Sequence, residues 1–378
     1  MQRGNKRYIK GVGMTKFGID ETPTNILTYE AISAALDNSG LTPNDIDAVV
    51  VSNTDTVYTG ERQRHFNSYI ADLIKRKIPI IRTPAVCGGG GAALWNACNF
   101  NYNNVLVVGA DKVMTSTSQV ITDQILEAAE RVFEQDEGLI FPAQNALVAQ
   151  QHMMKYDTTS DDLALVAYKN HLNGSMNPKA RFFGKKVSLE EIRNSPIVAS
   201  PLRLYDCSIS VNGAAAVVIS NDKSDIEISG SALSEDNIST FEREDMTTWN
   251  AVKIASEKAY KQAGVSPLDI DIAEIHDAFT IVEIISYEDL GFCEKGKGAE
   301  MIRNKETFVD GKIPVNVSGG LKARGHPISP TGLAQIYEIT KQLRKEAEDQ
   351  QVSNAKIGLA QNIGGAGGTV AVHILKKV

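Results

Sequence analysis

The chain has 378 residues, of which 42% are hydrophobic and 22% are charged, and its formal net charge is −7. This length favours two domains or one duplicated fold, and the acidic balance argues against a nucleic-acid partner. There is no apolar run of about 18 residues, which excludes a membrane span, and the basic N-terminus lacks the apolar core of a secretion signal. We therefore expect a cytoplasmic protein with no membrane partner.

A predicted helix, turn and strand at residues 31–51 is repeated at residues 255–275. In each copy, apolar residues at helical spacing predict a helix that ends at a glycine, Gly40 or Gly264. A Ser/Thr-Pro turn and an apolar strand follow. So many matched positions indicate a duplicated α/β unit. Further apolar strands are predicted in matching pairs, at 104–111 with 356–362 and at 213–220 with 368–375. Alternating strands and helices predict sheets that are covered by helices.

The cysteines are scattered and include no CxxC pair, so the sequence predicts neither a metal site nor a disulfide framework. Cysteines of this kind are most often small buried hydrophobic residues. That interpretation applies to each of the four in turn: Cys87, Cys98, Cys207 and Cys293.

Cys87 stands directly before four glycines and an apolar stretch that is predicted to be helical, VCGGGGAALWNAC. A cysteine at a helix N-terminus has its thiolate stabilised by unpaired amides and by the helix dipole. The glycines would let the chain turn tightly and let a ligand approach the sulfur, whereas packing alone would account for one or two of them. The pattern indicates a nucleophile, and the alternative is a buried cysteine where two helices pack.

The segment 113–205 has no counterpart in the second half of the sequence. An insertion of this length is often a lid or a substrate-binding loop, and its basic Arg181 is a candidate substrate contact. The predicted organisation is therefore an N-terminal half (1–112 with 206–224), the inserted loop domain (113–205) and a C-terminal half (225–378).

Two histidines stand at the ends of predicted elements. His276, in AEIHDAFT, follows an apolar strand, where functional side chains are common. His326, in NVSGGLKARGHPISPTG, precedes a helix expected to begin near Ser329-Pro330. Such a histidine can deprotonate a thiol or donate to an oxyanion, and the alternative for each is a structural role. In the same glycine-rich turn, Ser318 and Gly319 are candidate substrate contacts.

The glycines of QNIGGAGG (361–368) follow a strand, where they could cradle an oxyanion or allow close backbone packing. No GK[ST] follows them, and GVGMTK near the N-terminus lacks the third glycine of a dinucleotide fingerprint. We therefore discount NAD and ATP and expect no bound cofactor.

Together these motifs resemble those of the thiolase family, whose members make or break the carbon–carbon bond of 3-ketoacyl-CoA thioesters. GGLKARGHPISPTG is similar to the family's GHP signature, HDAF to the histidine form of its NEAF/HDCF motif, and QNIGGAGG stands where the family has CxGGG. The segments IKGVGMTKFG, NPKARF and SPLRLYDCSISVNGAAAVVI look most like the archaeal and bacterial acetyl-CoA C-acetyltransferase branch, which is related to sterol carrier protein thiolases. The resemblance implies an α/β fold of duplicated halves in helix–sheet–helix–sheet–helix layers.

The resemblance also implies a ping-pong reaction on coenzyme A thioesters. Cys87 would accept the acyl group after His326 takes its proton, and a second acetyl-CoA would then lose an α-proton and attack the acyl-enzyme. His276 and His326 could stabilise one developing oxyanion, and the amides of Cys87 and Gly365 the other.

The sequence departs from the family at the second catalytic cysteine. Asn362 occupies that position in the CxGGG segment, and Ala278 occupies the alternative position in HDCF. Asn362 cannot ionise, so it could only orient a water or donate a hydrogen bond. His276 and His326 are therefore the expected substitutes for the acid/base of the carbon–carbon step.

The leading prediction is an acetoacetyl-CoA thiolase, an acetyl-CoA C-acetyltransferase. In the branch that the chain resembles, the thiolase forms a homodimer or tetramer and associates with 3-hydroxy-3-methylglutaryl-CoA synthase and a small zinc-ribbon/OB-fold protein. Two alternatives stay open. One is a thiolase-fold aldolase that acts on sterol side-chain CoA esters, which would not need Cys87. The other is a non-catalytic scaffold or lipid-binding subunit.

Overall fold

The computed structural model describes residues 6–54 and 63–378, so residues 1–5 and 55–62 of the predicted N-terminal half lie outside the described residues. The strands are β1 (Arg7–Met14), β2 (Ala48–Ser52), β3 (Ile80–Arg82), β4 (Val105–Lys112), β5 (Ile197–Ala199), β6 (Leu202–Arg203), β7 (Asn212–Ser220), β8 (Ile226–Glu235), β9 (Ile272–Glu274), β10 (Ile357–Gly364) and β11 (Thr369–Lys377). The helices are α1 (Thr24–Ser39), α2 (Phe66–Ile74), α3 (Gly89–Cys98), α4 (Ser118–Leu126), α5 (Phe141–Tyr156), α6 (Ser160–Gly174), α7 (Leu189–Arg193), α8 (Asn250–Ala263), α9 (Thr280–Asp289), α10 (Gly298–Arg303), α11 (Gly320–Ala323) and α12 (Thr331–Arg344).

The two copies of the repeat fold alike. Helices α1 and α8 both end at a glycine in the left-handed region, Gly40 with φ 70° and Gly264 with φ 62°, as their sequences predict. A one-turn 3₁₀ helix follows each of them, at Pro43–Asp45 and Pro267–Asp269, and leads into the buried strands β2 and β9. Since both copies use the same cap and turn, the duplication predicted from the sequence is confirmed at the level of backbone geometry.

The sheets of the two halves are joined into one nine-stranded sheet with the order β3-β2-β4-β7-β1-β8-β11-β10-β9. The junction is a short antiparallel pairing of β1 with β8. On either side of it, β2 is parallel to β4, and β9 is parallel to β10. In the second half, the strand that would correspond to β3 is replaced by a single parallel bridge between Ala273 and Val315. The two sheet layers expected from the sequence are therefore continuous.

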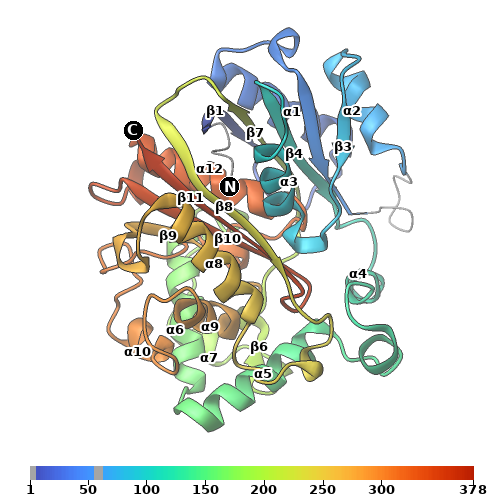
Figure 1. Ribbon diagram of the computed structural model, residues 1–378. Helices are drawn as coiled ribbons and strands as arrows, with labels where there is room; N and C mark the ends of the chain where they lie inside the picture. The colour runs from blue at the N-terminus through green and yellow to red at the C-terminus, as the bar shows by residue number, and fades with distance from the viewer. Residues whose placement is uncertain (1–5, 55–62) are drawn as a thin grey trace.

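Helices α3 and α12 lie against each other and contact strands of both halves of the sheet (Figure 1). Leu94 of α3 and Leu333 of α12 pack with apolar residues of these strands in one buried cluster. Helix α1 packs on the other face of the first half, and α8 packs on β8 and β11. The result is the expected layering, with α3 and α12 as the central layer between helices that cover the outer faces.

The inserted segment contains α4 to α7 and the small β5–β6 sheet. Figure 1 shows α5, α6 and α7 with α9 and α10 in the lower part of the molecule, and α4 apart from them beside the N-terminal half. Among the described residues, no helix is long and apolar enough to cross a membrane.

The four glycines after Cys87 are packing positions. All four are buried, and none has a positive φ. The distances from an added Cβ to its neighbours would be 2.9 Å to the Gly364 nitrogen at Gly88, 2.2 Å to Ser52 Oγ at Gly89, 2.6 Å to the Ser329 oxygen at Gly90 and 2.7 Å to Ala371 Cβ at Gly91. Each distance is too short for a side chain. The prediction that these glycines leave the sulfur open to a ligand is therefore wrong, because the space beside them is filled by protein.

Candidate active site

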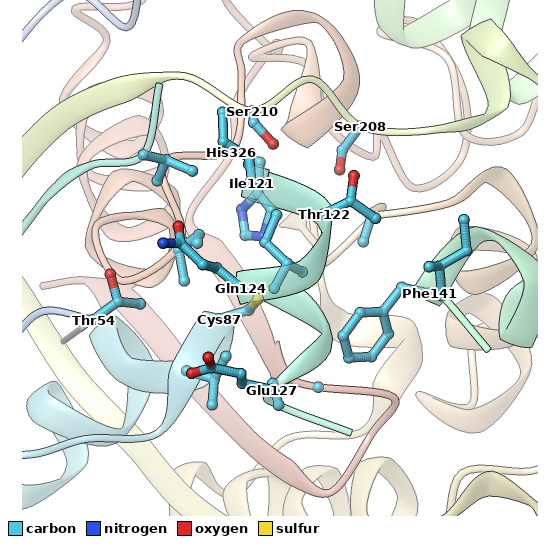
Figure 2. Close-up of a pocket in the computed structure, with 18 of the residues that line it drawn as sticks. Thr54, Cys87, Ile121, Thr122, Gln124, Glu127, Phe141, Ser208, Ser210 and His326 are labelled. Carbon is cyan, nitrogen blue, oxygen red and sulfur yellow. The ribbon is translucent and has the colours of Figure 1, made fainter. Parts of the chain in front are cut away.

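A cavity of about 680 Å³ lies between the two halves and the inserted segment. Its wall includes four of the residues predicted from the sequence, namely Cys87, His276, His326 and Gly365. In Figure 2 the ring of His326 and the sulfur of Cys87 face the same part of this cavity, and side chains of α4 line it in front of them. Folding thus gathers side chains that are widely separated in the sequence.

Cys87 belongs to a one-turn 3₁₀ helix, Val86–Gly88, which leads directly into α3. Burial raises the pKa of its thiol to about 12, whereas hydrogen bonds from the backbone of Gly365 and of Cys87 itself lower it. The expected stabilisation of the thiolate by the helix N-terminus is therefore outweighed by desolvation. At rest Cys87 is a thiol, and a base must take its proton before it can attack a carbonyl.

Val86 adopts a positive φ of 48° directly before the cysteine. A β-branched residue in this region is strained, and such strain is typical of functional sites. The tight turn expected at the glycines is thus made by a valine.

His326 is held on two sides. Its backbone N–H donates to the Ile209 oxygen at 2.8 Å, and its Nδ1 lies 2.7 Å from the hydroxyl of Thr331, the first residue of α12. Burial, with a smaller contribution from the charge of Arg324, lowers the pKa of His326 to about 3. His326 is therefore a neutral imidazole at rest, which is the form that can accept the proton of a thiol.

His276 lies perpendicular to His326, with 5.3 Å between the ring centroids. The side-chain amide of Asn362 contacts His276, with 3.4 Å between Asn362 Nδ2 and His276 Nδ1. The same Nδ2 donates to the Cys87 backbone oxygen at 2.9 Å, and Asn362 Oδ1 accepts from the Gly91 backbone amide at 3.0 Å. These partners leave one orientation of the amide, so Nδ1 of His276 faces a donor and must be an acceptor.

The proton of His276 consequently resides on Nε2. Burial, followed by the charges of His326 and Lys322, holds the pKa of His276 well below its usual value. A neutral imidazole with its proton on the other nitrogen is a hydrogen-bond donor. This geometry disfavours His276 as the base that the sequence suggested and suits it to stabilising an oxyanion. Asn362 itself does not line the cavity, and its amide group contacts the backbone of Cys87 and the ring of His276.

Asp277 has a structural task that sequence reasoning missed. Its carboxylate accepts from the Leu321 amide at 2.6 Å and from Asn170 Nδ2 at 2.8 Å. Gly320 packs against it, and a Cβ there would lie 2.5 Å from the carboxylate oxygens. Asp277 therefore fastens the loop that carries His326 to the strand end that carries His276.

Three predicted substrate contacts do not line the cavity. The Ser318 hydroxyl donates to Glu274 at 2.6 Å in the interior. Gly319, with φ 97°, packs against Gly174. The Arg181 amide donates to the Arg324 oxygen, so this segment of the insertion backs the loop before His326. Ser318 and Gly319 therefore lie in a turn enclosed by α6 and β9, and Arg181 lies behind that loop, so the structure places all three away from the cavity.

Asp111, at the end of β4, is a second group that sequence reasoning missed. One carboxylate oxygen accepts from the amide and hydroxyl of Thr54 at 2.8 and 2.7 Å, and the other accepts from the Ser329 amide at 2.9 Å. Burial raises its pKa to about 6, and its negative charge raises the pKa of Cys87. Only its position at a strand end could have drawn attention to it.

Asp111→Asn should therefore make Cys87 more reactive. Removing the negative charge favours the thiolate, and each unit by which the pKa falls increases the thiolate fraction about tenfold. Alkylation of Cys87 by iodoacetamide, followed by peptide mass mapping, should be faster in the variant at pH 8. The difference should shrink below pH 6, where Asp111 of the unmodified protein is itself protonated. Equal rates at pH 8 would contradict this coupling.

Among the described residues, no group of three or more His, Cys, Asp or Glu side chains could hold a metal ion.

Comparison with known proteins agrees with this geometry. Residues 8–223 match the family model for the thiolase N-terminal domain, and residues 230–377 match that for the thiolase C-terminal domain-like family. The chain is 40% identical to acetyl-CoA acetyltransferase of Methanothermobacter thermautotrophicus, covering 97% of this chain and 98% of the relative. It is 38% identical to the enzyme of the same name from Methanocaldococcus jannaschii, with the same coverage.

Among solved structures, the Ltp2-ChsH2(DUF35) aldolase superposes with a TM-score of 0.85 over 99% of this chain and 98% of its own, at 23% identity. At that identity, the likeness concerns the fold alone. The fold and the sequence matches together define the chain as an acyltransferase. Within that class, it belongs to the thiolase family.

Proposed function

We propose that this chain is an acetoacetyl-CoA thiolase that works through an acyl-enzyme on Cys87. The observation that carries the proposal is the convergence of a thiol and two neutral histidines on one cavity wall. The two archaeal relatives named acetyl-CoA acetyltransferase support acetyl-CoA as the substrate.

The first half-reaction follows from the protonation states. The neutral imidazole of His326 takes the proton of Cys87, and the thiolate attacks the carbonyl carbon of acetyl-CoA. The amides of Cys87 and Gly365 both hydrogen-bond to the sulfur at rest, so they are close enough to the reacting carbon to donate to its oxyanion. The tetrahedral intermediate then expels coenzyme A and leaves acetylated Cys87.

The second half-reaction joins two carbon atoms. A second acetyl-CoA loses an α-proton, and its carbanion attacks the acetyl-enzyme and releases acetoacetyl-CoA and the Cys87 thiolate. His276 Nε2–H is a preorganised donor for the enolate oxygen that forms when the α-proton leaves. Thiolysis of acetoacetyl-CoA is the reverse of these steps. None of them uses a cofactor.

The acyl-enzyme is tested by intact mass. Incubation with acetyl-CoA should add one acetyl group to the protein, and the adduct should be absent from Cys87→Ala. Cys98→Ala, which removes a thiol outside the cavity, should retain it. If the protein without any substitution shows no adduct at saturating acetyl-CoA, the proposal is refuted. That result would favour the sterol side-chain aldolase, which forms no such intermediate.

Three further expectations rest on the resemblance alone and stay predictions. They are a homodimeric or tetrameric state, a complex with 3-hydroxy-3-methylglutaryl-CoA synthase and a zinc-ribbon/OB-fold protein, and a cytoplasmic location.

A further inference from the structure

The carbon–carbon step of the proposed reaction needs a base on the cavity wall. Asn362 and Ala278 offer none, and His276 holds its proton on the nitrogen that is not occupied by Asn362. His326 serves Cys87. Glu127 on the wall is an exposed residue that follows α4. Among the described residues of the wall, the remaining group that can take up and release a proton without carrying a positive charge is the thiol of Cys207.

Cys207 lies on a segment whose backbone pairs with both of the loops that carry His276 and His326. It forms an antiparallel bridge with Phe279, and the amide of the next residue, Ser208, donates to the Ala278 oxygen at 2.8 Å. Three residues further along, Ser210 forms a parallel bridge with His326. Figure 2 shows Ser208 and Ser210 on this segment above the cavity. Cys207 is thus placed beside the position where the HDCF motif would carry its cysteine.

The buried side chain of Lys322 holds the Cys207 segment against the loop that carries His276. Lys322 Nζ donates to the Asp206 oxygen at 2.7 Å and to the Asp277 oxygen at 3.0 Å, the carbonyls directly before Cys207 and Ala278. The lysine is 1% exposed, so its charge acts through protein and not through water. It favours the thiolate of Cys207 and disfavours the protonated form of His276.

We propose that Cys207 is the acid and base of the carbon–carbon step; this inference rests on the proposed thiolase function. In the first half-reaction, the Cys207 thiol gives its proton to the departing sulfur of coenzyme A and becomes a thiolate. In the second, that thiolate removes the α-proton of the incoming acetyl-CoA and is a thiol again. The electron pair of the broken C–H bond forms the new carbon–carbon bond, the thioester bond to Cys87 breaks, and the Cys87 sulfur takes back the proton that His326 has held since the first half-reaction.

The resting state of Cys207 agrees with this order of events. Burial raises the pKa of its thiol to about 11, with the charge of Lys322 lowering it in part. It therefore begins the cycle protonated and acts first as an acid. Its thiol lies 3.6 Å from the Arg203 oxygen, a weak contact that a proton transfer can replace.

The test separates the two half-reactions. In Cys207→Ala, exchange of the acetyl-CoA methyl protons with deuterated water, followed by NMR, should fall by at least about 100-fold. Acetylation of Cys87 should change far less, because coenzyme A leaves readily as a thiolate with a pKa of about 8.5. Cys293→Ala, which removes a thiol outside the cavity, should behave like the unmodified enzyme in both assays.

Cys207→Ser distinguishes chemistry from packing. Serine keeps the size and the contact with the Arg203 oxygen but does not ionise in this range, so exchange should be lost as in the alanine variant. Exchange within twofold of the unmodified enzyme in either variant would overturn the proposal. If the unmodified enzyme forms no acetyl adduct at all, the proposed function fails as well. An adduct with normal exchange in Cys207→Ala overturns only the role of Cys207.

Discussion

His326→Ala should slow acetylation of Cys87 by about 100- to 10,000-fold, the range for loss of a positioned general base. Because burial holds Cys87 as a thiol and His326 as a neutral imidazole, the proton must move between them in the reaction itself. Rapid quenching followed by intact mass would give the rate of acetylation. Acetylation within threefold of the unmodified enzyme would show that another group activates the thiol.

Two further variants serve as comparisons for His326→Ala. Thr331→Val removes the hydroxyl that holds His326 Nδ1 at 2.7 Å, so it should slow acetylation by less than the alanine variant does. His276→Ala should damage condensation more than acetylation, because we assign the His276 donor to the enolate of the second half-reaction. Equal losses of both activities in His276→Ala would argue against that assignment.

Gly90→Ala should destabilise the protein by about 1–3 kcal/mol, the usual cost of overpacking a core. The added Cβ would lie 2.6 Å from the Ser329 oxygen and 2.9 Å from the Leu333 amide. Both are backbone atoms at the start of α12, so they cannot move aside as a side chain can. Urea unfolding followed by circular dichroism would measure the change in the free energy of unfolding.

Gly368→Ala is the matched control, since a Cβ there would meet only the Ile238 Cα at 4.0 Å. It should change the free energy of unfolding by less than about 0.5 kcal/mol. Gly90→Ala should also slow acetylation, because α3 follows Cys87 and α12 follows His326, and separating the helices separates the two groups. A Gly90→Ala protein as stable as the control would mean that α3 and α12 can move apart freely.

The fold was largely predictable from local signals. The glycines that close α1 and α8 are in the left-handed region, the strands at 104–111 and 213–220 were predicted within two residues of β4 and β7, and α12 begins one residue after Ser329-Pro330. Continuity of the sheet was not predictable, because it depends on the pairing of β1 with β8. The sequence of each of these two strands, taken alone, is that of an ordinary sheet strand and does not indicate its partner.

The sequence by itself determined the duplicated α/β units, the thiolase motifs and the candidates Cys87, His276 and His326. Caps, turns and motif spacing act over a few residues, so they can be read without coordinates. Only the tertiary structure decided that both histidines are neutral, that the four glycines are packing positions, that Asp111 acts on Cys87, and that Cys207 lines the same cavity. Burial and hydrogen-bond partners come from segments that are distant in the chain, so a residue's protonation state follows from where the fold places its neighbours.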